Sequence, residues 1–142
     1  MNFGTPIQKI FIVCVLVLAG CQSDSKQQVL ATDKSQVAIR AIQTRMFETS
    51  ELNRMVRTVI ATLQDLGFVI DRADDELGLV SATKLDGYAM RMTVTIRSKE
   101  NKQMIVRSSA QYNLVAVSDP KPYQQFFNAL EQAIFLKANE VD

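Results

Sequence analysis

The side chains that could do chemistry are few, and they exclude most kinds of catalytic site. The chain has 142 residues, 47% of them hydrophobic, with two Cys and no His. Without His a Ser-His-Asp site cannot be built, and the commonest general base and metal ligand are both missing. There is no glycine-rich phosphate loop, and no motif supports hydrolysis by a carboxylate pair. We therefore expect a protein that is not an enzyme and that uses no cofactor.

Four acids lie close together in the middle of the chain, at Asp71, Asp74, Asp75 and Glu76. A calcium loop needs oxygen ligands at alternating positions, a glycine at its sharp turn and a late bidentate Glu. Here the acids are spaced differently, and Gly78 follows them. We interpret the cluster as a solvated connection between two strands.

Three methionines have the thioether groups that suit Cu(I): Met90, Met92 and Met104. Met90 and Met92 are two residues apart, so on a strand they share a face with Val94 and Ile96. Methionine is a common filler of irregular cores. We expect all three to pack in the core, and we expect no metal site.

The charge balance argues against one class of partner. The chain has 16 Lys and Arg against 15 Asp and Glu. A nucleic-acid-binding domain normally has a clear basic excess. We expect no nucleic-acid partner.

The N-terminal segment carries a processing signal. An apolar run, Ile10 to Leu18, follows Lys9 and leads into the sequence Leu18-Ala19-Gly20-Cys21. The run is too short to span a bilayer, which needs about 20 residues, but it suits the core of an export signal. Leu18 to Cys21 resembles the lipobox of bacterial lipoprotein precursors. The resemblance implies that residues 1–20 are removed as a signal peptide and that Cys21 is the lipidation site, carrying diacylglycerol and an acylated amine.

This resemblance also predicts a location. Gln22, rather than Asp, follows the cysteine. By the sorting rules of such lipoproteins, that favours a lipid-anchored protein of the outer membrane, on its periplasmic side. Cys14 is lost with the signal and Cys21 is lipidated, so the mature chain has no thiol for a disulfide. Several acyl chains make the membrane anchor stable.

Residues 21–36 are polar and lack any period, so they read as a flexible tether with a reach of about 20 Å. The pattern becomes regular at Val37. Residues 37–142 are a natural length for one domain, since domains commonly have about 100–150 residues.

Apolar periodicity predicts seven elements in this domain. Ala38 to Glu48 alternates as a strand, although Gln43 and Arg45 share the side of its apolar residues. A helix follows, with Thr49 or Ser50 as N-cap and Gly67 as C-cap. Four strands and a last helix opened by Asp119 and Pro120 complete the order; the strands are expected at residues 68–72, 77–85, 88–98 and 103–115. The predicted class is α+β, in two layers: a five-stranded antiparallel sheet with two helices on one face, in the order β-α-β-β-β-β-α.

This order resembles the helix-grip arrangement, as in the repeated domains of lipoprotein C of the β-barrel assembly machinery. The segments Gln43 to Phe47 and Leu63 to Phe68 are also similar to a family of proteobacterial outer-membrane lipoproteins to which no activity is attached. The first resemblance rests on element order and covers about residues 37–138. Helix-grip folds often hold apolar ligands between helix and sheet.

A polar sheet face is the best candidate for binding. The predicted strands bring Arg91 and Arg97 beside Arg107 and Gln111, with threonines and serines between them. Such a face can simply be solvated. It can also be a docking surface, since guanidinium groups pair with carboxylates on envelope proteins or on peptidoglycan stems.

The first hypothesis is therefore a non-enzymatic binding or scaffold module of a cell-envelope complex, which docks through this face. The alternative is a carrier of a small apolar ligand or lipid, which would need a cavity above roughly 300 Å³ between helix and sheet. The last helix is rich in apolar residues, including Phe126, Phe127, Phe135 and Leu136. These could meet a partner, but we expect them to lie deep against the sheet.

Overall fold

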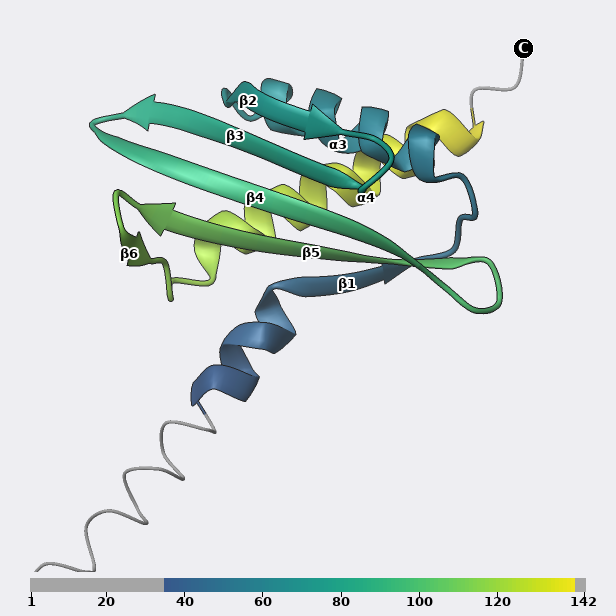
Figure 1. Cartoon of the computed structure of the whole chain (residues 1–142), viewed down its shortest axis with the longest axis horizontal. Coiled ribbons are helices and arrows are strands. Elements are labelled where there is room, and N and C mark those ends of the chain that lie inside the picture. The colour runs from purple at the N-terminus through teal and green to yellow at the C-terminus, as the bar shows by residue number, and fades with distance from the viewer. Residues whose placement is uncertain (1–34, 140–142) are drawn as a thin grey trace, which may run out of the picture. The chain divides into compact units, whose positions relative to one another are not determined.

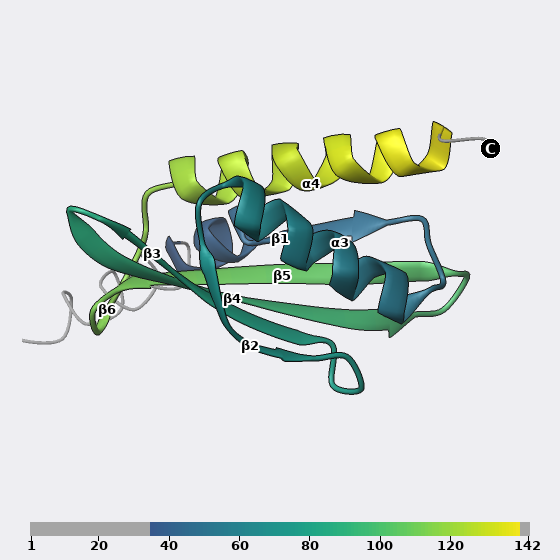
Figure 2. The same cartoon turned by 90° about the horizontal axis from the view of Figure 1, so that it is seen from above.

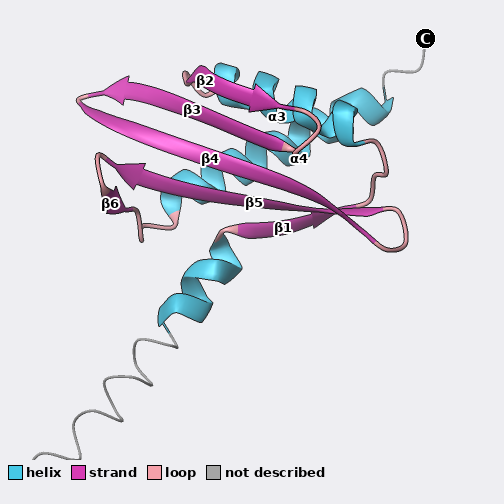
Figure 3. Ribbon diagram, in the orientation of Figure 1, coloured by secondary structure: helices cyan, strands magenta, loops and turns pink. Residues whose placement is uncertain are grey.

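The computed structural model of the protein describes residues 35–139. Every strand pair is antiparallel, and the order across the sheet is β1-β5-β4-β3-β2 (Figures 1 and 3). A short sixth strand pairs with β5 beside this path. The elements are β1 (Thr44–Phe47), α3 (Leu52–Asp65), β2 (Val69–Asp74), β3 (Leu79–Asp86), β4 (Tyr88–Lys99), β5 (Gln103–Tyr112), β6 (Val115–Ala116) and α4 (Lys121–Asn139).

Both long helices lie on the same face of the sheet, as the turned view shows (Figure 2). The predicted α+β class with two layers is confirmed. The core lies between the layers, and its largest fully buried side chains come from both: Leu63, Tyr123, Phe126, Phe127 and Leu130 from the helices, and Met92, Ile96 and Met104 from the sheet. Neither of the two long helices covers the other face of the sheet.

Helix α3 is the helix predicted between Thr49 or Ser50 and Gly67. Met55, Val59 and Leu63 are buried against the sheet. The helix ends as Gly67 predicts: with φ of 83°, Gly67 donates its N–H to Gln64 and the N–H of Phe68 returns to Leu63. This pairing is the Schellman motif, which satisfies the last free carbonyls of a helix. The predicted N-cap is shifted, because Glu51 occupies that position and no side chain caps the helix.

Helix α4 starts at Lys121, one residue after the predicted Pro120, and the Asp119 carboxylate accepts the N–H of Lys121 at 3.0 Å. Its buried Tyr123 has a role beyond packing. The Tyr123 hydroxyl donates to the Val117 carbonyl at 2.7 Å and accepts the Ala110 N–H at 3.2 Å. One side chain thus ties the helix to the end of β5 and to the segment that follows β6.

The prediction of a strand over Ala38 to Glu48 is wrong for most of its length. Residues 35–42 form a helix, which includes the last two residues of the predicted tether, and only Thr44–Phe47 pairs with β5. The N–H of Gln43 closes the last helical turn on the Ile39 carbonyl at 3.1 Å. Ile39 and Ile42 are three residues apart, a spacing that also fits one side of a helix.

The two polar residues that made this segment ambiguous do face the core side. Gln43 donates its side-chain N–H to the Tyr123 hydroxyl at 3.2 Å. The Arg45 guanidinium lies 5.3 Å from the centre of the Phe127 ring and donates to the carbonyls of Ala41 and Thr44. The Gln43 amide and the Arg45 guanidinium can lie on this side because each has an interaction partner there.

The end of the predicted fifth strand also differs. The strand stops at Tyr112, Asn113 adopts a left-handed φ of 52°, and the chain turns back so that Val115 and Ala116 pair with β5. In the predicted strand over residues 103–115, the period of two would place Leu114 on the core side, with Met104 and Val106. In the structure Leu114 is instead 94% exposed at the tip of this turn.

Ser108 is a polar residue in the core, and it allows the cost of burying its hydroxyl to be measured. It lies on the core face of β5, fully buried, and its hydroxyl has no hydrogen-bond partner among residues 35–139. A buried unsatisfied hydroxyl costs free energy, about 1–3 kcal/mol. Ser108→Ala should therefore leave the free energy of unfolding unchanged or raise it by up to about 1 kcal/mol, as measured by urea denaturation. A clear loss of stability would show that the hydroxyl makes an interaction in the fold.

Candidate functional site

The four predicted binding residues lie on the solvent face of the two central strands. Arg91 is directly opposite Gln111, and Arg107 is opposite Thr95. Arg97 is two residues beyond Thr95, so it is a diagonal neighbour of Arg107. Thr93 and Ser109 are cross-strand neighbours and lie between the Arg91–Gln111 pair and the Thr95–Arg107 pair, so the row is polar. The alternating burial of β4 and β5 places the core residues on the other face, as predicted.

Arg91 differs from the other two arginines, because it has an acidic neighbour. Its Nε lies 3.9 Å from Oδ2 of Asp71, which also accepts the Thr83 hydroxyl at 2.6 Å. Asp71 sits at an irregularity in the register of β2 with β3. This acid offsets part of the charge that Arg91 would offer to a partner.

Arg97 and Arg107 form no ion pair with an acid in the described part of the chain. Both are exposed, and they surround two apolar side chains of the same face, Ile105 and Met46, which are cross-strand partners. Met46 is 56% exposed, and the Lys99 ammonium approaches its sulfur at 3.8 Å. We call Met46, Arg97, Lys99, Ile105 and Arg107 the hairpin-end patch, since they gather near the β4–β5 turn.

Sequence reasoning did not find Met46, Lys99 or Ile105 as parts of this surface. Met46 belongs to this surface only because β1 pairs with β5, which brings Met46 next to Ile105 across 59 positions of sequence. The period of two along β4 does place Lys99 on the same face as Arg97, and that signal was available.

The acidic cluster is a strand connection. The Asp74 carboxylate accepts the N–H of Leu77 at 2.9 Å and lies 3.4 Å from the Arg72 guanidinium, so it organises the turn between β2 and β3. Among the described residues, no group of three or more Asp, Glu, His or Cys is arranged to hold a metal ion.

The methionines pack as predicted. Met92 and Met104 are at most 1% exposed, and Met90 is partly buried against the core. The expectation for the last helix is met in part. Phe126 and Phe127 are buried in contact with each other, whereas Phe135 and Leu136 are 68% and 63% exposed.

The hollows on the helix side of the protein have polar linings. One of about 470 Å³ lies between the start of α3 and the end of α4. Another of about 410 Å³, beside the β3–β4 turn, is lined by residues such as Lys84, Asp86, Asp119 and Lys121. The volumes exceed the 300 Å³ that a carrier would need, but both sites are open and charged. The core between the helices and the sheet consists of buried aliphatic, aromatic and methionine side chains.

Cys21, the predicted lipidation site, and residues 1–20 lie outside the described residues. Among residues 35–139, no helix is both long and apolar enough to cross a membrane. Compared with protein-family models and with curated proteins, the chain shows no match.

Proposed function

We propose that this protein is a non-enzymatic binding module of the cell envelope, which docks an acidic protein surface through the hairpin-end patch. The observation that carries the proposal is the state of Arg97 and Arg107. Both guanidinium groups are exposed on the sheet and have no acidic partner within residues 35–139, and they flank the apolar side chains of Met46 and Ile105.

This arrangement has the chemistry of a protein interface. Apolar side chains at the centre of a contact give up water, and the surrounding guanidinium groups pair with carboxylates in a planar, bidentate geometry. Each charge-assisted hydrogen bond contributes about 1.5–3 kcal/mol when it forms. The apolar centre favours a protein over the carboxylates of peptidoglycan, which we keep as an outcome of the test.

The location of this module is part of the proposal. The Leu18-Ala19-Gly20-Cys21 sequence supports a lipid anchor at Cys21, in the outer membrane and on its periplasmic side. A carrier function has less support, because the hollows are open and charged.

The double variant Arg97→Thr, Arg107→Thr tests the docking surface. A photo-crosslinking residue at Thr95, in the full chain and in intact cells, should give a crosslinked protein partner with an acidic surface. We expect the double variant to lose that crosslink, while its free energy of unfolding changes by less than about 0.5 kcal/mol, as for ordinary surface changes.

Two controls make the result specific. Arg91→Thr, on the same face, should reduce the crosslink much less, because Asp71 already offsets its charge. Arg97→Lys, Arg107→Lys keeps the charge but loses the bidentate geometry, so we expect partial crosslinking. An unchanged crosslink in the double threonine variant would contradict the proposal, and loss of retention on peptidoglycan alone would assign the surface to the cell wall.

A further inference from the structure

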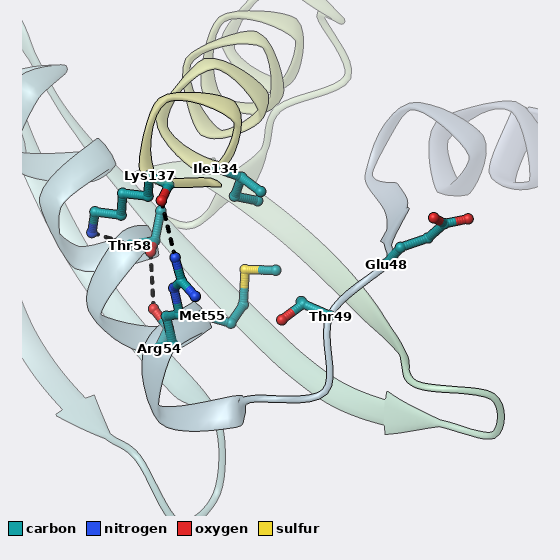
Figure 4. A pocket seen from close by; sticks show the side chains of 7 residues that line it. All are labelled: Glu48, Thr49, Arg54, Met55, Thr58, Ile134 and Lys137. Carbon is teal, nitrogen blue, oxygen red and sulfur yellow. Dashed lines mark hydrogen bonds between the residues drawn. The ribbon is translucent and has the colours of Figure 1, made fainter. Parts of the chain in front are cut away.

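A second basic site lies on the helix side of the protein, where α3 begins and α4 ends (Figure 4). The hollow of about 470 Å³ has Arg54, Thr58 and Lys137 on one side and Glu48 and Thr49 on the other, and Met55 and Ile134 complete its lining. An adjoining hollow of about 570 Å³ shares Arg54 and Lys137 and adds Arg57. Arg54 and Lys137 therefore line both hollows, and Arg57 lines the second.

Two of these cations are held in place by a network that joins the helices. The Arg54 guanidinium donates to the Lys137 carbonyl at 3.2 Å, and the Lys137 ammonium donates to the Thr58 hydroxyl at 3.3 Å. That buried hydroxyl donates in turn to the Arg54 carbonyl at 2.9 Å. None of these partners is an acid, so both positive charges keep most of their donors available for a ligand.

Arg57 has no internal role that would explain its position. It follows Arg54 by three residues, which places both on the same side of α3. It is exposed, and in the described part of the chain it makes no hydrogen bond or ion pair. Its guanidinium is fully available.

The charges around the hollows favour an anion. Two acids, Glu48 and Glu51, line the rim, but both are exposed and neither forms an ion pair with the three cations. In Figure 4 the Glu48 carboxylate lies across the hollow from Arg54. The N-cap of α3 is Glu51, whose side chain makes no capping hydrogen bond, and the first turn that follows it contains no acid.

We propose that Arg54, Arg57 and Lys137 bind a phosphate ester. Arginine and lysine are the usual protein partners of phosphate oxygens. The volume of the hollow exceeds what a bare phosphate needs, and Ile134, partly buried in its lining, offers an apolar surface to the organic part of an ester. The site lies on the opposite side of the sheet from the hairpin-end patch, so it stands independently of the proposed docking function.

Titration of the full chain in an uncharged detergent tests this site. The ligands are glycerol 3-phosphate, inorganic phosphate and dihexanoylphosphatidylglycerol, at an ionic strength held constant with chloride. Amide chemical shifts should show saturable binding centred on residues 54–58 and 137, tighter for the esters than for inorganic phosphate. Tighter binding of the phosphatidylglycerol than of glycerol 3-phosphate would identify a lipid headgroup as the ester, and the reverse order would identify a soluble one.

Arg57→Gln is the decisive variant, because no contact of the fold depends on Arg57. We expect it to weaken ester binding about tenfold, the loss of one charge-assisted contact. Arg72→Gln removes the same charge at an exposed position on β2 and should leave binding unchanged. Shifts that do not saturate, equal weakening by both variants, or equal affinity for inorganic phosphate and the esters would overturn the proposal.

Discussion

Replacing Gly78 by Ala should destabilise the protein by about 3–4 kcal/mol, through a left-handed backbone and a steric clash acting together. Gly78 has φ of 61°, a conformation that costs an L side chain about 1–2 kcal/mol. A Cβ at this position would also meet the carbonyl oxygen of Ile96 closer than two such atoms can approach. The obstacle is main chain, and Gly78 is held there because its own carbonyl accepts the Ile96 N–H at 2.7 Å.

Gly87→Ala is the matched control for this prediction. Gly87, in the turn between β3 and β4, has φ of 73°, but a Cβ there would have nothing within 4 Å. Only the backbone cost of about 1–2 kcal/mol should remain. Chemical denaturation of both variants measures the difference. Equal losses would mean that the β2–β3 connection does not approach Ile96 as closely as described.

These two glycines show what the sequence can and cannot predict. Asp86-Gly87 predicts a turn by itself, because the residues that need the turn are adjacent in the chain. The requirement for Gly78 comes from Ile96, on a different strand, and appears only when β3 and β4 are paired. The residues next to Gly78 in the sequence, including the four acids, do not predict its contact with Ile96.

Periodicity predicted the parts of the fold in which one face is buried. Helix α3 and strands β4 and β5 have long, regular alternations of apolar and polar residues, since each must present a single face to the same core. The prediction of β1 was mostly wrong because the strand has four residues and a mixed composition. Its conformation depends on distant partners: β5 for pairing, Tyr123 for Gln43, and Phe127 for Arg45.

For the candidate site, the sequence likewise predicted which face of a strand a residue occupies but not which residues of other elements lie next to it. The period of two correctly placed Arg91, Arg97 and Arg107 on the solvent face. It could not reveal that Asp71 approaches Arg91, because β2 reaches that row of the sheet only through β3. It also could not bring Arg54 and Lys137 together, since they are joined only where two helices meet.

Leu63→Ala should cost about 2–5 kcal/mol, the range for truncating a buried leucine. Leu63 lies in the middle of the buried stripe of α3 and is completely inaccessible to solvent, so the smaller side chain would leave a cavity that the surrounding core cannot fully close. A small domain has only about 5–15 kcal/mol of stability, so this one change removes a large part of it. Urea denaturation of the full chain, followed by circular dichroism, measures the loss.

Leu114→Ala makes the same chemical change at a position where it should have almost no effect. Leu114 is 94% exposed at the turn before β6, although its place in the sequence pattern predicted a core side chain. We expect a change within about 0.5 kcal/mol. The two variants therefore compare a leucine that the fold buries, on α3, with one that it exposes, after the end of β5. A loss under about 0.5 kcal/mol for Leu63→Ala would contradict the packing of α3 on the sheet, and a large loss for Leu114→Ala would return that residue to the core.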